Sequence, residues 1–177
     1  MIETRWDLTP FFADFAAPER EVFERSLADD AAALVARAAA LPPIASSAQA
    51  AADWEAVLLA HEKILARLSH LSTYVTCLAS ADADDARYAM AEGRVAVLRA
   101  TLEKVSVELR RVLGPLDDAA FAAFASRPAL DGARHYLHTL RVEAKTSMQP
   151  ALEGLAADLG AHGITGRGRL YDGISAK

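Results

Sequence analysis

The sequence has very little cysteine: Cys77 is the single one among 177 residues. No disulfide can therefore form within the chain, which favours a reducing compartment such as the cytoplasm. A free cysteine is commonly buried as a small apolar side chain, and we interpret Cys77 in that way. The alternative function for this thiol is that of a reactive nucleophile.

Long apolar runs and an excess of positive charge are also absent. No uncharged apolar stretch of about 18 residues occurs, and residues 1–7 lack the basic start and apolar core of a signal peptide. The net charge is −5 and the pI is about 5.5, which argues against nucleic-acid binding. We expect a soluble, cytoplasmic protein that binds neither nucleic acid nor membrane.

Patterns typical of β-strands are missing, and two segments instead carry a helical pattern. Hydrophobic residues make up 53% of the chain, and many of them are alanine, the best helix former. In both segments apolar residues recur at alternating spacings of three and four, as in helices that pack along a seam. The seams are Trp54, Val57, His61, Ile64, Leu68, Leu71, Val75 and Leu78, and Tyr88, Ala91, Val95, Leu98, Leu102, Val105, Leu109 and Val112.

A short polar connection, residues 80–85, joins the two segments. A connection of this length makes the helices antiparallel neighbours, so we expect a coiled-coil-like αα-hairpin packed along its length. Asp82, Asp84 and Asp85 lack the glycine and closing glutamate of a calcium loop and are interpreted as helix caps. The sequence predicts one all-α domain over residues 1–177, a helical bundle built around this long hairpin.

Further helices are expected on both sides of the hairpin. Pro18 begins a long helix, and Pro42-Pro43 ends it. The remaining helices carry Phe121 and Phe124; Leu130, Leu137 and Leu140; and Leu152, Leu155 and Leu159. The aromatic residues near the start of the chain are expected to tie down the N-terminus.

The segment His61-Glu62-Lys63-Ile64-Leu65 begins like the zinc motif His-Glu-x-x-His. In that motif two imidazoles four residues apart bind one zinc ion from the same side of a helix, and the glutamate acts as the base. Leu65 stands in place of the second histidine, and His61 lies on the seam. We therefore interpret His61 as a packed histidine.

His135 and His138 lie three residues apart on one face of an expected helix. Such a pair binds a metal ion when carboxylates join it, and Asp131 and Glu143 are near in sequence. A solvated pair of histidines is the interpretation we favour. Metal binding through His135 and His138 remains an alternative.

Residues 163–173 are rich in glycine, and we expect turns there before a short terminal helix. The segment lacks the spacing of a phosphate-binding loop and follows no strand, so it is not interpreted as a nucleotide site. Arg167 and Arg169 are candidates for binding an anion or a substrate carboxylate. The alternative is a solvated loop.

Four parts of the sequence, in order, resemble one family. These parts are Arg5-Trp6-Asp7-Leu8-Thr9-Pro10-Phe11-Phe12, then Leu65 to Ala83 with Leu68-Ser69-His70-Leu71-Ser72-Thr73-Tyr74, then Tyr136 to Arg141, then Thr165-Gly166 with Arg169-Leu170-Tyr171-Asp172. Together they resemble the N-terminal region of oligoendopeptidase F-like, thimet oligopeptidase-type zinc metallopeptidases. Two places depart from the family: Lys145 to Gln149 replaces an acidic stretch, and the region of Gly168 replaces an aromatic.

The resemblance implies a role without chemistry in this chain. The family's zinc site, His-Glu-x-x-His with a further glutamate, belongs to a downstream catalytic domain. The chain would be the non-catalytic N-terminal helical domain, which lines and gates the channel for oligopeptide substrates. By this resemblance zinc belongs to the parent enzyme, and we assign no catalytic, cofactor or metal residue here.

Two expectations about partners follow. The first partner is the catalytic peptidase domain, in the same chain or in a separate one, and the face that meets it is expected to be apolar and exposed in isolation. The alternative is a stand-alone helical scaffold without enzymatic activity, which forms a homodimer through its heptad seams.

Overall fold

The computed structural model describes residues 6–146 and 148–175. Within these ranges the chain forms seven α-helices, two short 3₁₀ helices and no strand, which confirms the predicted all-α fold. The α-helices are α1 (Pro18–Ala40), α2 (Ala48–Ala81), α3 (Ala86–Leu113), α4 (Asp118–Ala125), α5 (Arg134–Glu143), α6 (Pro150–His162) and α7 (Ile164–Ser175). The 3₁₀ helices are Ile44–Ser46 and Pro128–Ala133.

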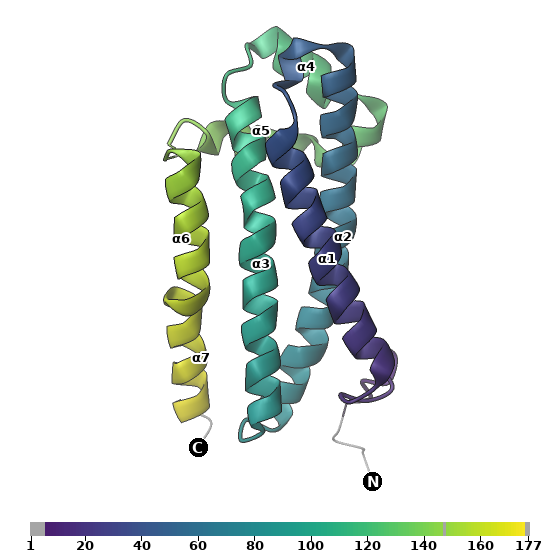
Figure 1. Ribbon diagram of the computed structural model, residues 1–177, viewed down its shortest axis with the longest axis vertical. Coiled ribbons are helices and arrows are strands. Elements are labelled where there is room, and N and C mark those ends of the chain that lie inside the picture. Colours follow the sequence, from purple (N-terminus) through teal and green to yellow (C-terminus); the bar gives the residue numbers. More distant parts are fainter. Residues whose placement is uncertain (1–5, 147, 176–177) are drawn as a thin grey trace.

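The helices form an elongated bundle (Figure 1). Helices α1, α2 and α3 lie side by side, and each contacts the other two. Helices α4 and α5 lie at the end where α3 finishes, and α6 and α7 then run back along α3. The result is a three-helix core with an end cap and a returning arm.

Polar side chains cap the helices where the sequence changes from loop to helix. Ser47 accepts a hydrogen bond from the backbone N–H of Ala50 at 3.0 Å, and α2 begins directly after this serine. Asp85 and Asp117 cap α3 and α4 in the same way. These contacts satisfy N–H groups that have no partner within the helix. The predicted capping role of Asp85 is therefore confirmed.

The two seams are buried in a core that α1 shares. Among the seam residues, Leu78 of α2 and Tyr88 of α3 are partly exposed, and the rest are buried. Helix α1 adds Leu27, Ala31, Leu34 and Ala38, each at most 5% exposed. Helices α2 and α3 follow one another along the chain and pack together, and their seams meet α1 as well as each other. The side chains that the homodimer alternative needs are thus occupied within one chain.

The entry to α2 is fixed by a buried tryptophan. Trp54 is fully buried, and its indole Nε1 donates a hydrogen bond to the carbonyl oxygen of Pro42 at 2.8 Å. This bond links the start of α2 to the proline pair that ends α1. The large indole ring fills the space between α1 and α2, and its single hydrogen-bond donor has a partner.

Substitution of a seam leucine is expected to destabilise the folded monomer. Leu102→Ala, at a position 2% exposed, should lower the free energy of unfolding by about 2–5 kcal/mol because it leaves a cavity. Val97→Ala on the same helix, at a position 47% exposed, should change it by about 0.5 kcal/mol or less. Urea unfolding measures both. A urea midpoint of unfolding that rises with protein concentration would instead indicate that the seam pairs between chains.

Candidate functional site

Helix α6 packs on α3 through its small residues and turns its leucines outward. Its partly buried side contains Gly154, Ala157 and Gly160, spaced three apart. Leu152, Leu155 and Leu159 are 52%, 54% and 62% exposed. A helix on a globular surface normally buries its leucines, so this arrangement is the reverse of the expected one. The predicted helical stripe is present, but none of these leucines is in the core.

Helix α7 continues the exposed apolar surface and corrects one prediction. The glycine-rich residues 163–173 were expected to form turns, but residues 164–175 are helical. Contacts of α7 with α6 and α3 outweigh the low helix propensity of glycine. Leu170, Tyr171 and Ile174 are 64%, 71% and 66% exposed. We call the exposed residues Leu152, Leu155, Leu159, Leu170, Tyr171 and Ile174 the α6–α7 surface.

An arginine of α3 holds α6 in this orientation. Arg110 contacts the carboxylates of Glu103 at 3.1 Å, Glu143 at 3.4 Å and Glu153 at 3.2 Å, and these lie on α3, α5 and α6. The side chains of Arg110 and Glu153 are each 14% exposed. Burial works against the charge of Arg110, but hydrogen bonds and attraction from Glu103 and Glu153 raise its pKa. The arginine stays charged and ties three helices together.

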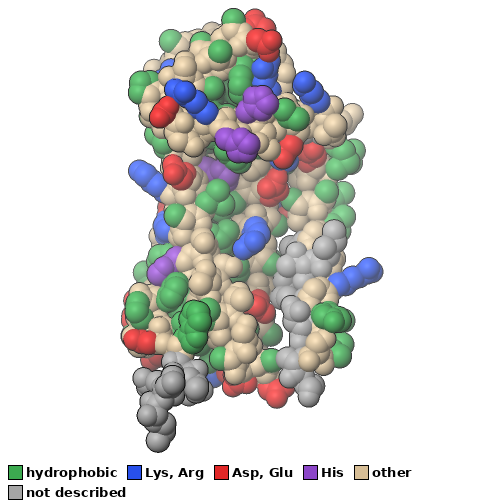
Figure 2. Space-filling view, turned by 180° about the vertical axis from the view of Figure 1, so that it is seen from behind, with side chains coloured by type: hydrophobic (Ala, Val, Ile, Leu, Met, Phe, Trp, Pro, Cys, Tyr) green, Lys and Arg blue, Asp and Glu red, His purple; other side chains and the backbone are tan. Residues whose placement is uncertain are grey.

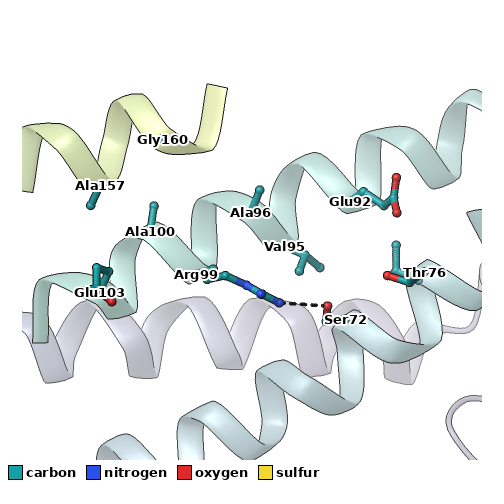
Figure 3. A pocket seen from close by; sticks show the side chains of 11 residues that line it. Ser72, Thr76, Glu92, Val95, Ala96, Arg99, Ala100, Glu103, Ala157 and Gly160 are labelled. Carbon is teal, nitrogen blue, oxygen red and sulfur yellow. Dashed lines mark hydrogen bonds between the residues drawn. The ribbon is translucent and has the colours of Figure 1, made fainter. Parts of the chain in front are cut away.

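A groove of about 440 Å³ runs along α3 between α2 and α6 (Figure 3). Ala96 and Ala100 of α3 line it, and Ala157 and Gly160 of α6 form one side. On the other side the guanidinium of Arg99 donates a hydrogen bond to Ser72 Oγ at 3.3 Å. These small residues were not singled out in the sequence; their spacing of three to four on each helix is the signal that identifies them. The groove offers an apolar floor beside charged groups.

His61 is packed in α2, as its seam position predicts. It is 3% exposed, and Leu65 occupies the place of the second zinc ligand at 41% exposure. His61 and Tyr136 line a cleft of about 500 Å³. Burial lowers the pKa of His61, so the ring is neutral at pH 7. In the described part of the chain, its Nε2 is buried without a hydrogen-bond partner.

His135 and His138 are both exposed on α5, at an end of the molecule where histidine side chains gather on the surface (Figure 2). Asp131 forms an ion pair with Arg134 at 2.8 Å, and Glu143 contacts Arg110. Within residues 6–146 and 148–175, no three His, Cys, Asp or Glu side chains are grouped closely enough to hold a metal ion. The structure therefore brings no third ligand to this pair.

Of the other candidate residues, the structure describes the side chains of Cys77 and Arg167. Cys77 is half-buried in α2 beside the N-terminal segment, so the expected burial is only partial. Arg167 is exposed, and the side chain of Arg169 lies outside the described residues. Arg5, the first residue of the family-like opening, also lies outside them. Cys77 lines a cleft that Arg167 does not line, so these two described side chains share no cleft.

Aromatic contacts anchor the N-terminal segment to α2 and α3, with ring centres 4.9 Å apart for Phe11 and His70 and for Phe15 and Tyr88. Phe12 is 7% exposed and packs edge-on against Tyr74, with ring centres 5.0 Å apart. Trp6 is 86% exposed. The expectation that the aromatics tie down this terminus holds for Phe11, Phe12 and Phe15 and not for Trp6.

Comparison with known proteins yields no match: no family model, no curated protein and no solved structure is significantly similar to the chain. Among the described residues, no helix combines the length and apolar character that crossing a bilayer requires.

Acid is expected to destabilise the protein through His61. The pKa of His61 is lowered from 6.5 in the folded state, so between the two pKa values the unfolded chain binds more protons. The free energy of unfolding should therefore fall as the pH drops below about 6.5. His61→Leu should remove this component and stabilise the protein by about 1–3 kcal/mol at pH 7.5, because a buried unpaired polar atom is lost.

Urea unfolding at pH 7.5 and pH 5.5 measures the effect. The exposed His135→Gln serves as the matched control and should keep the wild-type pH dependence. An equal loss of stability in wild type and His61→Leu between these pH values would contradict the assignment to His61.

Proposed function

We propose that this chain is the non-catalytic N-terminal helical domain of an oligoendopeptidase F-like zinc metalloendopeptidase, acting in the cytoplasm. The catalytic zinc domain is its partner, in the same chain or in a separate one. The domain lines and gates the channel through which oligopeptides reach the zinc ion. This chain contributes no zinc ligand.

The observation that carries the proposal is the α6–α7 surface. Six large apolar side chains, each at least 52% exposed, lie on one helical arm of an otherwise well-filled bundle. Exposed apolar patches of this kind are typical of surfaces that another protein element covers. Arg110 and the small residues of α6 hold the arm so that these side chains face outward. A catalytic domain docked on the arm would bury them.

The groove along α3 supports the channel-lining role. Its floor is made of alanines, which leave room for an extended backbone, and charged groups at Arg99 and Glu103 lie along its length. A surface with an apolar floor and polar edges suits unfolded peptides of varied sequence, because few of its contacts depend on which side chains the peptide carries. The groove lies beside α6, so a domain docked on the arm would adjoin it.

The alternative proposal is a stand-alone helical scaffold that forms a homodimer. The same α6–α7 surface favours it, since two copies of an exposed apolar face cover each other. The seams of α2 and α3 are less suited to this pairing because their side chains are buried within the chain. A dimer that persists when the protein is diluted would favour the scaffold proposal over the peptidase-domain proposal.

The genomic reading frame tests the proposal most directly. The frame that continues after Lys177, or a neighbouring gene, is expected to encode His-Glu-x-x-His and a further glutamate. The chain alone should not cleave a fluorogenic oligopeptide, with or without added zinc, since its one partial motif has Leu65 in place of a ligand. Chelator-sensitive cleavage by the purified chain, or a genome with no such coding sequence nearby, would rule the proposal out.

Polar substitution of the α6–α7 surface should abolish association without loss of stability. Leu152→Gln, Leu155→Gln and Leu159→Gln together remove exposed apolar area, and glutamine keeps a good helix propensity. The wild-type chain is expected to self-associate weakly in sedimentation velocity at about 50–500 µM, and the triple variant to stay monomeric. The matched control Val22→Gln with Val142→Gln, at positions 60% and 50% exposed, should associate like the wild type. Equal sedimentation of wild type and triple variant would contradict a docking role for this surface.

A further inference from the structure

A third cleft, far from the α6–α7 surface along the sequence, lies where the N-terminal segment meets the end of α2. Its volume is about 720 Å³, which is within the usual range of small-molecule sites. Aromatic rings form much of its wall: Trp6, Phe12, Phe15, Tyr74 and Tyr88. Edge-to-face contacts hold four of these rings in place, with centres 4.9 Å apart for Phe15 and Tyr88 and 5.0 Å apart for Phe12 and Tyr74, whereas Trp6 is 86% exposed. Most of the aromatic wall is therefore preformed.

The charge along this cleft has one sign. Asp7, Asp14 and Asp82 line it, and no lysine or arginine of the described residues does. Two arginines border the cleft and are paired with other carboxylates. Arg20 lies over the ring of Phe15 at 4.5 Å and contacts Glu24 at 2.7 Å. Arg87 lies 5.9 Å from the rings of Phe15 and Tyr88 and contacts Asp85 at 2.6 Å, which leaves Tyr74, Phe12 and Trp6 as the rings without a guanidinium of the described residues over them. The three lining carboxylates therefore give the cleft a negative potential that favours a cation.

Tyr74 presents a free hydroxyl to this cleft. The residue is 2% exposed, and its ring packs against Phe12. Its hydroxyl makes no hydrogen bond in the described part of the chain. The hydroxyl is also not fully buried, because the one fully buried polar side-chain atom without a partner in that part is His61 Nε2. The Tyr74 hydroxyl is thus the accessible tip of a buried ring, and the fold itself does not use it. A buried side chain with an accessible polar tip is typical of ligand clefts.

The geometry distinguishes between the cations that fit. A metal ion needs several carboxylates converging on one point, and within residues 6–146 and 148–175 no such group is found. Aromatic faces attract an ammonium ion whose apolar body lies in the cleft. We propose that the cleft lined by Asp14, Tyr74 and Tyr88 binds a small organic ammonium ion that carries an aromatic or aliphatic group. This site is independent of the proposed peptidase role.

Three probes that share one ring and differ in charge test the site. Benzylamine is a cation at pH 7, benzyl alcohol is neutral and benzoate is an anion. Fluorescence of Trp6 reports on the cleft, because Trp6 lines it. The other tryptophan, Trp54, is fully buried in the core and does not line the cleft. Benzylamine should bind about tenfold more tightly than benzyl alcohol, and benzoate should not bind.

The same titration contains the outcomes that would overturn the proposal. Equal affinity for benzylamine and benzyl alcohol would indicate a merely apolar cleft. Stronger competition by magnesium chloride than by sodium chloride at the same ionic strength would indicate a metal site. Absence of a benzylamine signal up to about 10 mM, in both fluorescence and calorimetry, would refute binding.

Two substitutions separate binding from folding. Tyr74→Phe removes a hydroxyl that the fold does not use, so the affinity for benzylamine should fall about fivefold while Tm stays unchanged. Asp14→Asn should weaken binding about fivefold as well, and its amide oxygen can still accept the hydrogen bond from the backbone N–H of Ala16. Unchanged affinity in both variants would overturn the assignment.

Matched controls complete the design. Tyr136→Phe removes the hydroxyl that contacts Ser106 at 3.4 Å outside this cleft. Asp84→Asn removes a charge from the α2–α3 turn, which also contains the lining residue Asp82. Asp84 itself is exposed and does not line the cleft. Both controls should bind benzylamine like the wild type. A loss in the controls equal to that in Tyr74→Phe and Asp14→Asn would show that the effect is not local.

Discussion

Burial of the α2 and α3 seams against α1 is the constraint on which the rest of the molecule depends. Side chains such as Trp54, Leu71 and Leu109 have no exposed surface. Once these three helices are packed, the hairpin is a rigid support for everything attached to it. The end cap, the returning arm, the groove along α3 and the aromatic cleft are all positioned by contacts to α2 or α3. The surfaces proposed to bind partners and ligands are therefore additions to a core that is filled without them.

The core was predictable because each of its helices repeats a local signal. The heptad spacing from Trp54 to Val75 marks one continuous buried face, and the aspartates at 82–85 mark a turn. The arm was harder to predict. The pattern of Leu152, Leu155 and Leu159 correctly indicates a helix, but periodicity alone does not say which face packs inward. In the structure Gly154 and Ala157 lie on the partly buried side of α6, and Glu153 pairs with Arg110 of α3, which are tertiary contacts that the periodicity does not contain.

Some features of the candidate sites were predictable from the sequence, and others were not. The position of His61 on a seam predicted its burial, and the missing histidine at Leu65 argued against a zinc site. The aromatic cleft was not predicted, because Asp14, Tyr74 and Tyr88 are far apart in sequence and meet only after the hairpin has turned back. Helix α7 was missed for a related reason: glycine favours turns in isolation, and packing against α6 and α3 overrides that preference.

The junction between α3 and the end cap has an effect far from its own position. A Cβ atom on Gly114 would lie 3.0 Å from the Cβ of Ala144, so the end of α3 and the end of α5 touch with no space for an added carbon. The arm starts a few residues after Ala144, and its starting point is therefore set by this contact. A side chain at position 114 would have to push Ala144 away by a few tenths of an ångström. A displacement there would act on the segment that leads into α6, whose Ala157 and Gly160 lie across the groove from Ala96 and Ala100.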